Sequence, residues 1–239
     1  AARDGALRVL HAAGKTGPII MTSSIAAMMY RPGRASEFSV KEEDWTDTDW
    51  RALTPYVVSK TAAELAAWDA AVIGGFMRSL TMINPSLVLG PPLDEDIGAS
   101  LFVIKALMTG AYPAVPPVSL PIVDVRDVAA LHVAALEAPK VGGRRLIASA
   151  DTLSFKEVAD ILRACFAHRA KKIPTATLPA WAVRVLALAD RNIASVTADL
   201  DARPIIQTDY VSALTNIRFR PAREAIIDAG SALERLNVI

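Results

Sequence analysis

The chain has 239 residues, of which 52% are hydrophobic and 21% are charged, and its formal net charge is +1. That length and composition predict a globular protein with one sizeable core or two small ones. A net charge this close to zero provides no field for nucleic acid or for an anionic membrane, so we expect neither as a partner. No apolar run approaches the ~18 residues that a membrane span needs.

The chain contains a single cysteine, Cys165, and the apolar helical pattern around it predicts a core position. One cysteine excludes a disulfide within the chain and favours a reducing compartment, so we expect the cytoplasm. The three histidines are scattered along the sequence, and no cluster has the spacing of a metal site.

Residues 1–14 have leucines at helical spacing with no capping residue before them, which predicts the rear of a crossover helix. Gly17 and Pro18 then lead into an apolar run at 19–21 that predicts a buried strand. Thr22, Ser23 and Ser24 follow at the carboxyl end of that strand, where open α/β sheets place ligands. The alternative for these hydroxyl residues is a turn or a helix cap.

The segment 25–53 is polar and irregular, which predicts a loop that either walls a substrate pocket or only covers the surface. A helix of about five turns is expected next, from Thr54 to Gly75. Thr54 is a good N-cap, Pro55 suits the first helical position, and glycine can end the helix. The helix is apolar nearly all round, so we expect it to be buried on every side.

Tyr56 and Lys60 lie four residues apart in this helix and therefore project from one face. A free phenol has a pKa near ~10, which makes it a poor acid at neutral pH, but a neighbouring ammonium favours the phenolate. Such a pair, if buried, supplies a usable general acid or base. The spacing alone is weak evidence, because it also arises by chance.

The rest of the chain predicts further alternating strands and helices, with a boundary at Gly142-Gly143. The expected strands are 79–83, 122–125 and 144–149, and the expected helices are 98–109, the segment from Asp124 or Asp127 to Glu137, 154–168, 179–190 and 221–236.

Four blocks together resemble a known family. They are TSS at 22–24, YVVSKTAAELAAW at 56–68, NPSLVLGP at 84–91 and VDVRDVAALHVAALE at 123–137. In this order and spacing they resemble the extended short-chain dehydrogenase/reductases, the branch that includes dihydroflavonol-reductase-like aldehyde and ketone reductases and the NAD-dependent epimerase/dehydratases. The resemblance implies an α/β fold with a Rossmann-type doubly wound parallel sheet. Residues 1–141 would belong to the dinucleotide-binding domain, with 91–121 contributing to a smaller helix-rich substrate lobe formed by 142–239.

The resemblance also implies a chemistry, which is the reduction of a small-molecule carbonyl by NADPH, with NADH not excluded. Ser24, or alternatively Ser23, would hydrogen-bond the carbonyl oxygen, Tyr56 would donate the proton, and Lys60 would favour the Tyr56 phenolate and hold the nicotinamide ribose. The implied cofactor contacts are Thr22, Ser23, Tyr56, Lys60, Pro85, Ser86, Leu87, Val88 and Ser100, where a helix-start role is the alternative for Ser100.

The family's glycine-rich phosphate motif is not found in these 239 residues. We expect it about ninety residues upstream of Ala1, in an N-terminal portion missing from this sequence. Residues 1–239 alone should then bind cofactor poorly, and micromolar NADP(H) binding in a calorimeter would contradict this.

The substrate is less accessible from sequence. Met29 stands where similar plant flavonoid reductases carry an amide side chain, which favours an apolar aldehyde or ketone over a polyphenol. The Asn-Trp-Tyr motif typical of cinnamoyl-CoA reductases is not found. The alternatives are a nucleotide-sugar epimerase or dehydratase and a non-catalytic cofactor-binding sensor on the same fold, and an oligomer stays open.

Overall fold

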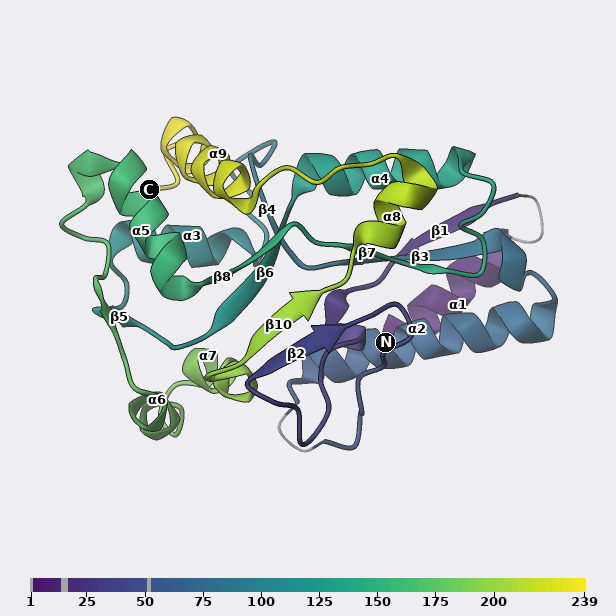
Figure 1. Ribbon diagram of the computed structural model, residues 1–239, viewed down its shortest axis with the longest axis horizontal. Helices are drawn as coiled ribbons and strands as arrows, with labels where there is room; N and C mark the ends of the chain where they lie inside the picture. Colours follow the sequence, from purple (N-terminus) through teal and green to yellow (C-terminus); the bar gives the residue numbers. More distant parts are fainter. Residues whose placement is uncertain (1, 14–16, 51–52) are drawn as a thin grey trace.

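A computed structural model describes residues 2–13, 17–50 and 53–239 (Figure 1). The helices are α1 (Ala2–Ala13), α2 (Pro55–Gly74), α3 (Leu101–Thr109), α4 (Val125–Glu137), α5 (Phe155–Cys165), α6 (Ala180–Leu186), α7 (Arg191–Ala194), α8 (Asp209–Thr215) and α9 (Ala222–Arg235). The strands are β1 (Ile19–Thr22), β2 (Glu37–Val40), β3 (Leu80–Pro85), β4 (Leu87–Leu89), β5 (Ala114–Val115), β6 (Ser119–Asp124), β7 (Arg145–Ala148), β8 (Asp151–Ser154), β9 (Ala176–Thr177) and β10 (Arg203–Ile206).

The sheet that positions the site is parallel, with the strand order β1-β3-β7. Helices α1 and α2 lie on one face of this sheet and α4 and α8 lie on the other (Figure 1). Helix α4 packs its buried Leu131 and Ala135 against the strands. The predicted α/β fold with a parallel sheet covered on both faces is therefore confirmed, and the carboxyl ends of its strands meet at one edge.

Helix α2 begins and ends where its sequence predicts. The Thr54 hydroxyl accepts a hydrogen bond from the Val57 N–H, Pro55 opens the helix, and Gly75 closes it in the left-handed conformation with φ 70°. Its inner face packs Ala67 and Ala71 against β3 and α1. These small side chains allow the helix to approach the sheet closely.

The expectation that α2 is buried on every side is wrong. Its outer stripe reaches solvent, and the side chains of Leu65, Val72 and Ile73 are 41%, 62% and 88% exposed. The helix has the sheet and α1 on its inner sides, and no other described element covers the outer stripe.

A second core lies among α3, α5 and α9 and the sheet β4-β6-β8 (Figure 1). Its centre contains apolar residues that are 0% exposed, including Ile104, Leu162 and Ile226. Helix α5 begins with a capping box in which Ser154 and Glu157 bond each other's backbone N–H groups.

One segment differs from the sequence prediction. The segment 25–53 is not irregular throughout, because β2 within it pairs in parallel with β10 from the tail. Residues beyond Gly142 contribute to the first sheet, because β7 completes it and α8 packs on it. The division of the chain into two domains at Gly142 stays a prediction. Which residues serve cofactor and which serve substrate stays a prediction.

Cys165 also differs from the sequence prediction, because it is exposed at the end of α5 rather than part of the core. In the described part of the chain, every helix is too short or too polar to traverse a bilayer.

Candidate active site

The sequence-predicted serine and tyrosine meet at the carboxyl edge of β1. Ser24 caps a short 3-10 helix at 25–27, and its Oγ accepts a hydrogen bond from the Ala26 N–H at 3.2 Å. The Tyr56 hydroxyl donates to the same Ser24 Oγ at 3.4 Å. Because a hydroxyl has two acceptor sites and one proton, these two bonds leave the Ser24 proton free for another acceptor.

Ser24 is buried, but Tyr56 is more exposed than a residue of a buried helix should be. Ser24 is 8% exposed, whereas Tyr56 is 56% exposed, so the pair is not a closed buried couple. Tyr56 is the second residue of α2, and its exposure agrees with this position at the end of the helix.

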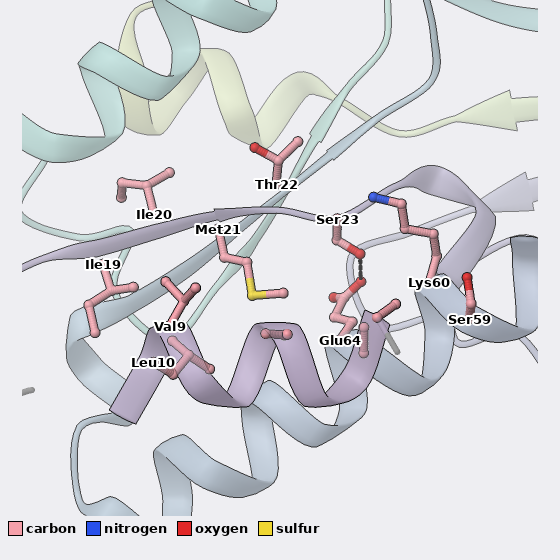
Figure 2. A pocket seen from close by; sticks show the side chains of 14 residues that line it. Val9, Leu10, Ile19, Ile20, Met21, Thr22, Ser23, Ser59, Lys60 and Glu64 are labelled. Carbon is pink, nitrogen blue, oxygen red and sulfur yellow. Dashed lines mark hydrogen bonds between the residues drawn. The ribbon is translucent and has the colours of Figure 1, made fainter. Parts of the chain in front are cut away.

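Lys60 lies one turn after Tyr56 and extends from α2 toward the carboxyl end of β1, beside Ser23 (Figure 2). It borders a groove of about 410 Å³ between α1, β1 and α2. Within the described residues the Lys60 ammonium has no hydrogen-bond or ion-pair partner, although it carries three donors. It is therefore available to a ligand at this edge.

Thr22 and Ser23 point to opposite sides of β1, as neighbours on a strand must (Figure 2). The Ser23 hydroxyl donates to the Glu64 carboxylate of α2. Thr22 Oγ1 lies 2.7 Å from His132 Nε2, and His132 Nδ1 lies 2.8 Å from the Val128 carbonyl oxygen. Since a carbonyl can only accept, Nδ1 donates to it, and in this tautomer of the neutral ring Nε2 accepts from the Thr22 hydroxyl. The Thr22 side chain lies on the side of β1 opposite to Ser23.

The predicted cofactor contacts at 85–88 lie where β3 ends and β4 begins. Pro85 and Ser86 are buried, and Leu87 and Val88 belong to β4, which pairs with β6. The Ser86 Oγ is buried without a partner among the described residues. Ser100 precedes α3 and makes no capping hydrogen bond, so its hydroxyl is not used by the helix start.

Two buried charged residues that the sequence reading did not single out stand beside these groups. Glu64 of α2 is 0% exposed and Arg145 of β7 is 5% exposed, and Arg145 Nε lies 2.6 Å from Glu64 Oε1. Glu64 lies four residues after Lys60, so helical spacing places it on the Tyr56–Lys60 face. A carboxylate among alanines in an apolar helix was the signal that could have identified it.

A second polar cluster joins the segment after β1 to the tail. Asp199 accepts hydrogen bonds from the Tyr30 hydroxyl and from Arg34, each at 3.0 Å. Burial raises the pKa of Asp199 above its ordinary value, although Arg34 opposes the shift. Burial and then Asp199 raise the pKa of Tyr30 well above its ordinary value, and Tyr56 adds to this. Tyr30 therefore stays protonated near the candidate site.

No metal centre is found, since the described residues contain no group of three or more His, Cys, Asp or Glu side chains that could hold an ion.

Sequence comparison finds relatives among reductases. Residues 2–148 match the model of the NAD dependent epimerase/dehydratase family. The chain is 40% identical over 167 residues to cinnamoyl-CoA reductase 1 of Arabidopsis thaliana, which covers 68% of this chain and 48% of that protein. It is 32% identical over 147 residues to tetraketide alpha-pyrone reductase 2 of the same plant, which covers 61% of this chain and 45% of that protein. The chain thus spans about half the length of the curated relatives it matches.

Solved structures share the fold. The yeast methylglyoxal/isovaleraldehyde reductase Gre2, complexed with NADPH, superposes with a TM-score of 0.76 at 24% identity, over 100% of this chain and 71% of that one. Vestitone reductase from alfalfa (Medicago sativa) gives a TM-score of 0.75 at 20% identity, over 100% of this chain and 72% of that one.

Proposed function

Because this chain belongs to the NAD dependent epimerase/dehydratase family, we propose that it is part of an NAD(P)H-dependent oxidoreductase that reduces an aldehyde or a ketone to an alcohol. The observation that carries the proposal is the hydrogen bond between the Tyr56 hydroxyl and Ser24 Oγ. Lys60, which has no partner among the described residues, lies one helical turn away. The names of the relatives support it, since they are carbonyl-directed reductases and the Gre2 structure contains NADPH.

The donor set at the sheet edge fits a nicotinamide nucleotide. The Lys60 ammonium, which has no partner in the described part of the chain, would bind the ribose hydroxyls, because an ammonium is a good donor to neutral oxygen acceptors. The buried Ser86 hydroxyl, which has no described partner, would bind the nicotinamide end together with the backbone of 85–88. Of the other proposed contacts, Thr22 would use only its main chain, because its side chain is bonded to His132. Ser23 and Ser100 stay proposed contacts.

The chemistry of the proposed reaction divides between three side chains. Bound cofactor would supply the hydride to the carbonyl carbon. The Ser24 hydroxyl donates a hydrogen bond to the carbonyl oxygen, which stabilises the charge that develops there. Tyr56 then transfers its phenolic proton to that oxygen as the general acid. Lys60, one helical turn further along α2, is the proposed counter-charge for the phenolate that is left.

We propose an apolar aldehyde or ketone as substrate. Met29 is buried among Ile25, Met28 and Phe38, and it offers no amide that would bind a polyphenol hydroxyl. This cluster follows Ser24 directly in the chain, so the surroundings of the proposed carbonyl site are apolar. Because the sequence contains a single cysteine, which favours a reducing compartment, we propose that the activity is cytoplasmic.

The test is NADPH oxidation by the full-length protein with methylglyoxal, isovaleraldehyde and cinnamaldehyde. We expect turnover of at least one of them, with NADPH preferred to NADH. Epimerisation of a UDP-sugar without net NADPH oxidation would overturn the proposal in favour of a nucleotide-sugar epimerase. Cofactor binding without turnover of any carbonyl or sugar would support a sensor.

A further inference from the structure

The buried pair formed by Glu64 and Arg145 connects several parts of the candidate site. Glu64 Oε2 accepts hydrogen bonds from the Ser23 hydroxyl and from Asn84 Nδ2, the latter at 2.8 Å. The other carboxylate oxygen, Oε1, accepts from Arg145 at 2.6 Å and from the Trp68 indole at 3.4 Å. Both carboxylate oxygens are therefore used, and the charge is compensated inside the protein.

Asn84 carries this arrangement to Ser24. Its amide nitrogen donates one hydrogen to Glu64 and one to the Ser24 carbonyl oxygen, at 2.8 and 3.2 Å. Ser23 is the residue before Ser24 and is bonded to the same carboxylate. Glu64 thus holds Ser23 directly through its side chain and holds the main chain of Ser24 through Asn84, and the orientation of the Ser24 hydroxyl depends on that main chain.

Arg145 links Glu64 to the segment that follows Ser24. Its guanidinium donates to the carbonyl oxygens of Ala27 and Glu42, at 3.4 and 3.0 Å, and to that of Asp44. It also lies 3.9 Å from the ring centroid of Trp45. A single side chain in β7 therefore anchors both ends of the 27–45 segment to the sheet.

We propose that Glu64, compensated by Arg145, is a positioning residue that fixes the Ser24 hydroxyl opposite Tyr56 and so sets the rate of the reduction. The inference rests on the proposed reductase function. It requires the negative charge of Glu64 and not only its volume, because Arg145 would otherwise be buried without a counter-charge. Glu64 makes no contact with Tyr56 and is not itself a proton donor in this scheme.

The main test is Glu64→Gln, which keeps the shape and removes the charge. We expect kcat to fall roughly 10- to 100-fold while the KM for NADPH changes little, because a small misplacement of a catalytic group has an effect of this size. Asp127→Asn is the matched control. Asp127 is also a buried carboxylate paired with an arginine, Arg220, but it belongs to α4. It should lose stability without losing kcat.

A double-mutant cycle with Ser24→Ala separates positioning from general destabilisation. If Glu64 acts through Ser24, Glu64→Gln should cost nothing further in the Ser24→Ala background, whereas independent effects multiply. Asn84→Ala gives the same test with both charges still paired, in case Glu64→Gln does not fold. Multiplying losses, or a wild-type kcat in Asn84→Ala, would overturn the proposal.

Amide hydrogen exchange supplies a readout that does not depend on activity. We expect the amides of 23–27 to exchange faster in Glu64→Gln than in wild type, and to stay at the wild-type rate in Asp127→Asn. Unchanged exchange in Glu64→Gln would overturn the positioning role even if the reductase function holds. Faster exchange in a protein that turns over no carbonyl would instead overturn the reductase function and leave the anchoring intact.

Discussion

The carboxyl edge of the β1-β3-β7 sheet and the core under α3, α5 and α9 are built from different interactions. The first buries hydrogen-bonded and charged groups, among them Ser23, Glu64 and Arg145. The second is an apolar cluster with Leu162 at its centre. Directional bonds fix individual atoms, whereas apolar packing fixes volume, so the first region should control rate and the second should control stability.

The largest expected effect in the polar region belongs to Tyr56→Phe. Removal of a general acid should lower kcat about 10²- to 10⁴-fold. The thermal midpoint should barely change, because Tyr56 is 56% exposed and its hydroxyl bond to Ser24 is long. Steady-state NADPH oxidation and thermal unfolding measure the two. A kcat within a few-fold of wild type would remove Tyr56 from the mechanism.

The next prediction compares two serines that cap helices, Ser24 in the polar region and Ser154 in the apolar region. Ser24→Ala should lower kcat about 10²- to 10³-fold through loss of a donor to the developing oxyanion. Ser154→Ala removes the capping serine of α5 and should cost about 1 kcal/mol of unfolding free energy with no change in kcat. Kinetics and urea unfolding of both variants test the comparison, which fails if the two serines behave alike.

Leu162→Ala should reverse the pattern. Leu162 is 0% exposed in the apolar core, so truncation should lower the free energy of unfolding by about 2–5 kcal/mol. The kcat per folded molecule should equal that of wild type. If urea unfolding shows the loss but kcat also falls, the two regions are coupled more closely than their different chemistry indicates.

The smallest expected effect concerns pH and Asp199. Because burial raises its pKa above 3.8, the folded protein binds this proton more tightly than the unfolded chain does. Stability from this group should therefore fall as pH rises from about 3.8 through the raised pKa, and return on acidification. Asp199→Asn should flatten that part of the pH profile measured by urea unfolding. An unchanged profile would contradict the prediction.

The sequence predicts the fold well where local signals agree with burial. Thr54, Pro55 and Gly75 mark the ends of α2, and Asp124 caps α4 as one of its two expected candidates. The pair Tyr56 and Ser24 was also accessible, because a helix face and a strand end meet at a known edge of a parallel sheet.

The rest depends on contacts that no local pattern contains. The exposure of Tyr56 follows from what covers α2, and hydropathy alone predicted a buried helix. Glu64 was missed because its partners, Asn84 and Arg145, come from strands 20 and 81 residues away. Short strands such as β2 were missed because each is stabilised by its partner and not by its own four residues.

The pairing of β2 with β10 has a consequence for how the protein matures. Arg34 and Asp199, which lie 165 residues apart, also join these two parts of the chain. On the ribosome, the segment after Ser24 must wait until about 165 further residues have been synthesised before it finds its partner strand. A truncated nascent chain can thus form the helix that carries Tyr56 while β2 is still without its partner strand β10.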